Sequence, residues 1–516
     1  MTGFIFVDGR QNDRSTQRRM RRHVMKGKNA GKTLQRASRL PPGKQLMRRK
    51  DESAKPALPF MPSYAFTTST STGASLTLSE QLTILQRLPP AATFHSPVAM
   101  TAYAWQVIDE YFNGTVERVY APSFGIASDT AKPLWFQSIF ADEAAYHCTL
   151  ALMQASNEAV LGAATGCVLA SSGVAYAHYV AESLRQLKRR LAGPKALANS
   201  TILLVLMFIS QEQMRHESKN ARVHIAGLRQ MVALRGGLAE FETRGVDRPL
   251  LIKICKIDIV YALQFGTPPL FYRDVLSSVT AKLDIGGRCA QEATSTAETH
   301  HSSLSERQPD LYSMLVDVMA VALLFEDELP QRPIDIFTFG DIFSSLSYRL
   351  LKAGLDTFPG DKVDELYHLG MTMFSMALFL RFDQGRLLDY QPIGRRFKAV
   401  VEDEGVERSQ DKSERSEDQK EDETCFWVMM LGGTWTRGDW SGSGVEVKAE
   451  LGGDCPGRQQ KARKVRQVAD RLGLSSWEDA RALLAKYPWL TVLHDKPGRE
   501  LWEASREVQE KDNGSR

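Results

Sequence analysis

Glu365 and His368 have the spacing best suited to chemistry, because side chains three residues apart share a helix face and could hold a metal ion together. A carboxylate-bridged di-iron site needs two such pairs and further glutamates from other helices, so one pair does not supply it. Glu212 and His216, four residues apart, have the spacing of a helical contact pair. We therefore interpret the first pair as surface residues of an amphipathic helix and the second as an ordinary i,i+4 contact.

Other motifs of catalysis or metal binding are absent from the sequence. His300 and His301 lie in a polar stretch, predicted as a loop, without partners at ligand spacing, and Leu161–Gly166 lacks the Lys-Ser/Thr ending of a phosphate-binding loop. No Gly-x-Ser-x-Gly elbow occurs. The six cysteines are at least nineteen residues apart, which leaves no Cys-x-x-Cys spacing for zinc. The sequence therefore predicts a protein that is not an enzyme, with no catalytic residue, metal ligand or cofactor.

Positive charge is concentrated at the start of the chain. Residues 1–50 are crowded with Lys and Arg against only two acids, whereas the whole chain carries a net charge of +4, so the remainder is acidic. A basic arm of this kind suits a nuclear import receptor or the phosphates of nucleic acid. A solubilising tail and a mitochondrial presequence are the alternatives. The candidate contact residues are Arg18, Arg19, Arg21, Arg22, Lys26 and Lys28.

Composition divides the chain into five parts. Residues 1–92 combine the basic arm with a Ser/Thr/Pro-rich linker, and this composition predicts disorder. Residues 93–400 have the apolar periodicity of a helical domain. Residues 401–424 are almost all charged or polar, and this composition predicts a disordered loop. Residues 425–505 are predicted to be the C-terminal helical part of the same domain. Residues 506–516 are predicted to be a disordered tail.

The apolar periodicity predicts an all-α fold, an irregular array of packed antiparallel helices. The longest apolar run, Ile202–Ile209, is too short to cross a membrane. Ser475 to Glu478 resembles a capping box that would start the last of the predicted helices. These helices are Val98–Phe112, Leu134–Gln154, Ser172–Leu191, Asn199–Met214, Ser218–Leu234, Pro249–Gln264, Leu311–Phe325, Phe337–Ala353, Val363–Phe382 and Trp477–Lys486.

The segment 224–238 combines an apolar stripe on one helix face with residues that favour the end of a helix. Gly227 would let a neighbouring helix approach closely. Gly236 and Gly237, directly after Arg235, stand where a helix end favours a left-handed residue. We interpret the segment as a structural motif of packing and termination. The predicted stripe comprises Ile225, Leu228, Met231, Val232 and Leu234.

This segment resembles a recurring element of the fungal-specific transcription factor domain. The basic arm, with Phe4–Asp8 ahead of it, is similar to the start of fungal proteins described as transcription-factor-like or, in some cases, as tachykinin family. The order of several loose motifs strengthens the resemblance. The other matching motifs are Phe94–Pro97, Leu134–Gln137 with Phe140, Ser476–Asp479 with Tyr487–Trp489, and Leu493–Asp495.

The resemblance implies a helical regulatory domain and a role in transcription in the nucleus, with an import receptor and other regulatory proteins as partners. Weak, non-specific contact of the arm with nucleic acid is a further expectation. Typical members of the family read DNA through six closely spaced cysteines that hold two zinc ions, and that spacing does not occur here, so we expect no zinc-cluster reader. A cytosolic protein-interaction module and a helical small-ligand-binding protein are the alternative functions.

Overall fold

Helices make up almost all of the described structure. The computed structural model describes residues 96–116, 126–127, 132, 135–136, 139–165, 172–214, 218–284, 287–328, 334–354, 361–379, 390–402, 412–433 and 456–514. Within these ranges the only strands are β1 (Ile126–Ala127) and β2 (Ile334–Asp335), which pair in parallel. The predicted all-α fold is confirmed.

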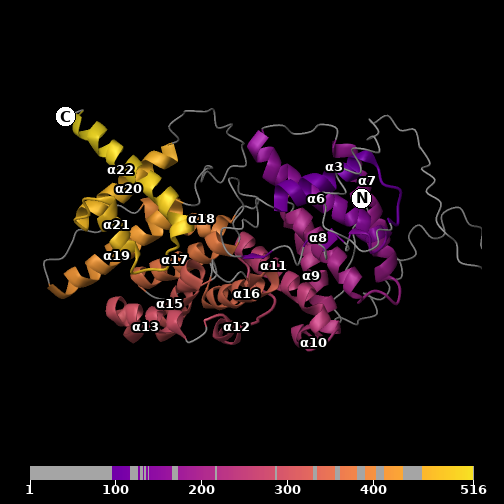
Figure 1. Cartoon of the computed structure of the whole chain (residues 1–516), viewed down its shortest axis with the longest axis horizontal. Coiled ribbons are helices and arrows are strands. Elements are labelled where there is room, and N and C mark those ends of the chain that lie inside the picture. Colours follow the sequence, from indigo (N-terminus) through magenta and orange to yellow (C-terminus); the bar gives the residue numbers. More distant parts are fainter. Residues whose placement is uncertain are drawn as a thin grey trace, which may run out of the picture. The chain divides into compact units, whose positions relative to one another are not determined.

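The N-terminal helices pack around α6, which contacts α3, α7 and α8 (Figure 1). α6 begins after Asp142, whose carboxylate accepts a hydrogen bond from the backbone N of Ala145 at 2.9 Å. Three predicted helices, those over residues 172–191, 199–214 and 218–234, are confirmed at their predicted bounds. The elements of this group are α3 (Ala102–Glu110), the π-helix η2 (Tyr111–Thr115), α6 (Glu143–Thr165), α7 (Ser172–Leu191), α8 (Asn199–Met214) and α9 (Ser218–Leu234).

The middle of the chain continues the array, with α11 packed against α8 and α16, and α16 packed against α17. Four of its helices were not predicted from the sequence, because they are short or largely polar and lack a clear apolar period. Those four are α10 (Leu238–Thr243), α12 (Leu276–Leu283), α13 (Arg288–His300) and α14 (Ser302–Arg307). The others are η4 (Gly245–Asp247), α11 (Arg248–Phe265), α15 (Pro309–Leu323), η5 (Leu324–Glu328), α16 (Ile336–Ala353) and α17 (Lys362–Phe379).

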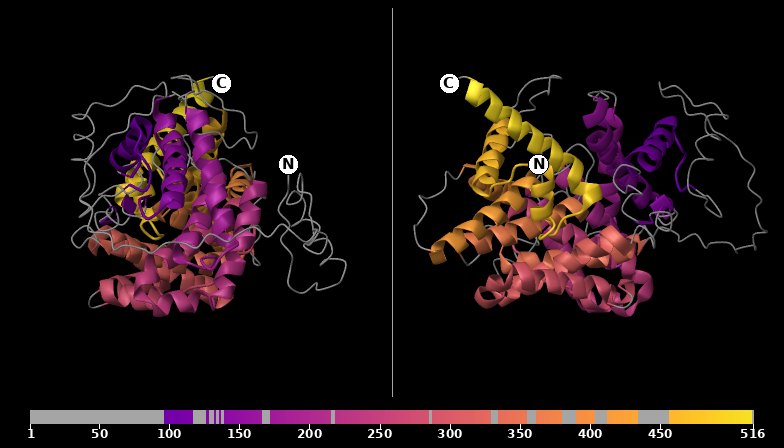
Figure 2. Two further views of the ribbon diagram at one scale, coloured as in Figure 1. Left: turned by 90° about the vertical axis from the view of Figure 1, so that its right-hand side faces the viewer. Right: turned by 60° about the vertical axis from the view of Figure 1, so that its left-hand side comes forward.

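The C-terminal helices include α20 and α22, which lie side by side and both contact α19 (Figure 2). The capping box of α21 involves Ser476 and Asp479, one residue later than predicted, and Ser475 adds a further hydrogen bond to Asp479. The elements are α18 (Gln391–Glu402), α19 (Lys412–Gly433), α20 (Pro456–Arg471), α21 (Trp477–Leu484), η6 (Thr491–Asp495) and α22 (Lys496–Gly514).

Two predictions of disorder are wrong for the residues that the structure describes. Residues 412–424, predicted as part of a solvated loop, form the first part of α19. Their charged side chains pair with distant helices: Asp422 accepts a hydrogen bond from Arg471 at 2.6 Å. Residues 506–514, predicted as a disordered tail, continue α22. Lys, Glu, Gln and Arg are good helix formers, so high charge alone does not predict a loop.

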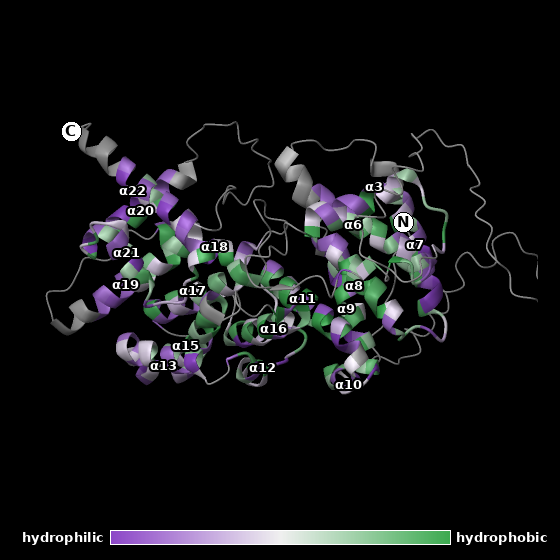
Figure 3. Ribbon diagram, viewed as in Figure 1, coloured by the Kyte–Doolittle hydropathy of each residue, from purple (hydrophilic) through white to green (hydrophobic). Residues whose placement is uncertain are grey.

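The core is built around helices that are apolar on most sides. α8 and α11 are buried along most of their length, which explains why their sequences are hydrophobic almost all round. Figure 3 shows this difference, because α8 and α11 are mainly hydrophobic whereas α20 and α22 carry many hydrophilic residues. No described helix is long and apolar enough to cross a membrane.

Two helices of this core approach closely at Gly370 of α17. A Cβ atom built on Gly370 would overlap the indole ring of Trp427 in α19. Trp427 cannot easily move, because it is fully buried, stacks on Tyr487 with ring centroids 5.0 Å apart and donates a hydrogen bond to the carbonyl of Pro488 at 3.1 Å. Glycine at position 370 therefore sets the distance between α17 and α19.

A buried carboxylate holds the segment between α11 and α12. Asp258 accepts hydrogen bonds from the backbone N of Leu270 at 2.8 Å, from the backbone N of Phe271 at 3.0 Å and from the Tyr348 hydroxyl at 3.0 Å. Burial raises the pKa of Asp258 to about 6. The segment after α11 is thereby fixed to both α11 and α16.

Candidate interaction surface of the helical domain

The basic arm lies outside the described residues. Arg18, Arg19, Arg21, Arg22, Lys26 and Lys28 all belong to the part of the chain that the structure does not describe. Their roles in nuclear import or nucleic-acid contact stay predictions.

The turn after α9 has the predicted left-handed geometry. Gly236 and Gly237 have φ angles of 95° and 86°, which side chains with a Cβ atom rarely adopt. The backbone N of Gly237 donates to the carbonyl of Val232 at 2.9 Å and so closes the helix end. The glycine pair therefore ends α9 and directs the chain into α10.

Arg235 connects the end of α9 to two other elements. Its guanidinium donates to Asp247 of η4 at 3.0 Å and also to the Asn199 side chain at the start of α8. Asn199 in turn donates to Asp247 at 2.6 Å, and the guanidinium lies 4.2 Å from the centre of the Phe241 ring. The side chains of Arg235 and Asp247 are only 12% and 3% exposed. We interpret this arrangement as structural, because the side chains of Arg235, Asp247 and Asn199 hydrogen-bond to one another.

α9 has a second apolar face that the described residues leave open. Val223 is 43% exposed and Leu234 is 64% exposed, although both are large and apolar. Gly227 lies between them on the same face, and no described atom comes within 4 Å of a Cβ atom built on it. The predicted close helix approach at Gly227 is therefore wrong. The assignment of Leu234 to the buried stripe is wrong too, although Ile225, Leu228, Met231 and Val232 are buried as predicted.

One comparison with known proteins finds a match within this helical region. Residues 110–322 match the model of the fungal specific transcription factor domain. The matched residues, which make up less than half of the chain, are similar to that domain. The match supports the resemblance drawn from the sequence and indicates a regulatory protein. No curated protein and no solved structure matches the chain. α9 lies inside the matched residues, so its open face belongs to the matched domain.

The open face of α9 could have been predicted from the residue spacing in the sequence. Val223, Gly227 and Leu234 follow the spacing of one helix face, opposite the buried stripe, and a helix with apolar residues on two faces must bury both or expose one. Exposed apolar side chains that share one helix face are typical of surfaces that bind other proteins, and Val223 and Leu234 lie on one face with the polar Gln230 between them. A search of the α9 sequence for a second apolar face, besides the buried stripe, would have identified the exposed face.

Two of the histidines singled out in the sequence, His301 and His368, are buried, whereas His300 is exposed. Burial lowers the pKa of His368 to about 3, and its ring nitrogens contact the Leu350 carbonyl at 2.9 Å and the Arg396 guanidinium at 3.1 Å. The interpretation of Glu365 and His368 as a surface pair is therefore wrong for the histidine. Since both ring nitrogens are engaged, His368 has no lone pair ready for a metal.

His301 behaves in the same way. Its ring nitrogens contact the Tyr367 hydroxyl at 2.6 Å and the Lys486 carbonyl at 2.8 Å. It follows α13 directly and is fully buried, so its placement in a polar loop was wrong. Burial lowers its pKa to about 3, so the ring stays neutral and ties α17 to the segment after α21. His216 lies outside the described residues.

A small cavity lies between α11, which belongs to the matched domain, and α16 and α17, which follow it. It has space for roughly one water molecule. Ser347, Thr372 and Ser375 line it together with Leu263 and Met376, and its lining includes no titratable residue. A cavity of this size holds a bound water more readily than an organic effector.

The described cysteines are single buried thiols. Cys148, Cys255, Cys289 and Cys425 are all buried and lie outside any disulfide. Burial raises the pKa of the Cys148 and Cys255 thiols to about 12, which disfavours the thiolate form that binds metals. These cysteines act as small hydrophobic residues of the core.

Proposed function

We propose that the protein is a nuclear transcriptional regulator that works through contacts between its helical domain and other regulatory proteins. The observation that carries the proposal is the open apolar face of α9 inside the matched transcription factor domain. The proposal includes the absence of a zinc-cluster reader, which rests on the wide spacing of the six cysteines. In this proposal, the protein reaches its genes through partner proteins.

The partner is proposed to place an apolar helix on α9. Gly227 lies on this face with space above it, and small residues let two helix backbones approach closely. Val223 and Leu234, on either side of Gly227, supply apolar area on the same face. Charged residues are depleted from the centres of protein interfaces, and this face has none at those three positions.

We expect regulation to depend on α9. The full chain, joined to an unrelated DNA-binding domain in a fungal cell, should change the expression of a reporter gene beside the tethering site. The double variant Val223→Glu and Leu234→Glu should reduce this change roughly tenfold, because it places charge where apolar area would be buried. Reporter expression at equal protein abundance is the measurement.

The matched control is Val492→Glu, which changes a residue of η6 that is 53% exposed and lies outside the matched domain. It should leave the reporter unchanged. A tethered chain without any effect on the reporter would contradict a regulatory role. Equal effects of the control and the α9 variant would contradict the assignment of the contact to α9.

The arm is proposed to deliver the domain to the nucleus through an import receptor. Residues 1–50 fused to a fluorescent reporter should concentrate it in the nucleus, and replacing Arg18, Arg19, Arg21 and Arg22 with Ala should abolish the accumulation, because import receptors bind clustered cations. The nuclear-to-cytoplasmic fluorescence ratio is the measurement.

The control replaces Arg48, Arg49 and Lys50 with Ala, which removes charge from the arm but leaves the first cluster intact. An evenly distributed reporter would favour the cytosolic alternative. A mitochondrial signal would favour the presequence alternative.

A further inference from the structure

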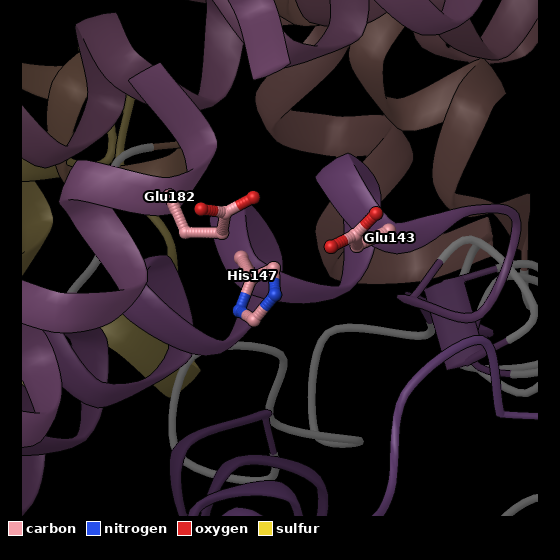
Figure 4. A group of neighbouring side chains, drawn as sticks. All are labelled: Glu143, His147 and Glu182. Carbon is pink, nitrogen blue, oxygen red and sulfur yellow. The ribbon is translucent and has the colours of Figure 1, made fainter. Parts of the chain in front are cut away.

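Four titratable side chains come together between α6 and α7. Glu143 and His147 are four residues apart on α6, and His178 and Glu182 are four residues apart on α7, so each pair shares a helix face. One ring nitrogen of His147 and carboxylate oxygens of Glu143 and Glu182 all lie within 4.8 Å of one another. Figure 4 shows the three side chains around one common space. The ring of His178 lies next to that of His147, with centroids 5.8 Å apart.

The imidazole of His147 supplies an independent reason to look for a ligand. Its side chain is only 5% exposed, and its Nδ1 atom finds no hydrogen-bond partner among the described residues. A buried polar atom without a partner is costly, so native structures rarely leave one.

The surrounding groups permit access and rearrangement. Glu143 is exposed, so an ion can enter from solvent. Glu182 accepts hydrogen bonds from Arg185 at 2.5 and 2.8 Å and from Gln186 at 3.0 Å. The Arg185 side chain is 59% exposed, and exposed ion pairs contribute little to stability, so Arg185 can turn away at low cost.

We propose that Glu143, His147 and Glu182 bind a divalent metal ion of the zinc type, with the adjacent His178 available as a fourth ligand from α7. A mixture of imidazole nitrogen and carboxylate oxygen suits Zn²⁺, whereas Ca²⁺ and Mg²⁺ take oxygen ligands. The site joins α6 to α7 within the transcription factor domain. Its predicted effect is to fix the position of α7 when the metal is present.

Metal titration of the full chain tests the proposal. After treatment with a chelator, the protein should bind Zn²⁺ saturably in calorimetry and melt roughly 5 °C higher at a hundredfold excess over Kd. Glu143→Gln and Glu182→Gln should each weaken this binding at least about tenfold, because each removes a charged ligand. An amide keeps the size of each side chain, and the melting temperature of each variant without metal shows whether it folds.

A second measurement reports on coordination directly. Co²⁺ in the site should give visible absorption bands, and His147→Gln should shift or remove them. The control, Glu240→Gln, changes an exposed carboxylate of α10 and should bind Zn²⁺ like the unaltered protein. The absence of saturable Zn²⁺ binding would overturn the proposal. Binding that Glu143→Gln and Glu182→Gln leave unchanged would overturn it as well, because the metal would then lie elsewhere.

Discussion

Arg235→Ala is expected to lower the free energy of unfolding by about 3 kcal/mol, because it leaves the carboxylate of Asp247 buried without its cation. Asp247 is 3% exposed and would keep only the hydrogen bond from Asn199. The same change removes the contact between the guanidinium and the Phe241 ring. Urea unfolding followed by circular dichroism measures the loss.

The control for this prediction is Arg244→Ala. Arg244 pairs with Glu240 at 2.7 Å, but the two side chains are 60% and 39% exposed, so the pair should contribute at most about 0.5 kcal/mol. Replacing Arg235 and Asp247 together with Leu should be less damaging than Arg235→Ala alone, since no unpaired charge remains. Similar losses for Arg235→Ala and Arg244→Ala would contradict the buried-charge explanation.

Gly370→Ala is expected to destabilise the protein by about 2–3 kcal/mol, because its methyl group would overlap the buried ring of Trp427. The ring is held between Tyr487 and the Pro488 carbonyl, so relief would require α17 and α19 to move apart. The urea midpoint and the near-ultraviolet circular dichroism of the tryptophans should both change.

Gly227→Ala is the matched control, since Gly227 also lies inside a helix but has open space above it. Here the methyl group meets nothing, and the better helix propensity of alanine should stabilise the protein by about 0.5–1 kcal/mol. The two substitutions are chemically identical and should act in opposite directions. A loss of stability at Gly227, or none at Gly370, would contradict the packing described for these two helices.

Local sequence patterns predicted a helix well where its own residues show apolar periodicity and a recognisable helix end. The bounds of α7, α8 and α9 follow from apolar periodicity and from the glycine pair after Leu234. The charged start of α19 was mistaken for a loop, because its stabilising partners are remote in sequence. Asp422 pairs with Arg471, and Lys362 pairs with Glu421 at 2.6 Å.

Long-range contacts also explain the errors about histidine. His301 is buried because Tyr367 and Lys486, far along the chain, supply its hydrogen-bond partners. Composition predicts that a histidine beside polar residues is exposed, and it carries no information about such partners. The cluster of Glu143, His147 and Glu182 was missed for the same reason: the α6 pair is visible in the sequence, but only packing brings α7 beside it.

The matched domain ends at residue 322, inside α15, yet the hydrophobic core continues past that point. α11, within the match, packs on α16, outside it, and the short β1–β2 pair joins residues 126–127 to residues 334–335. A chain cut at residue 322 would expose the apolar sides of α11 and α15 to water. The exposed surfaces of separate molecules could then contact one another. The matched segment and the helices after it therefore share one hydrophobic core, and we expect neither part to fold without the other.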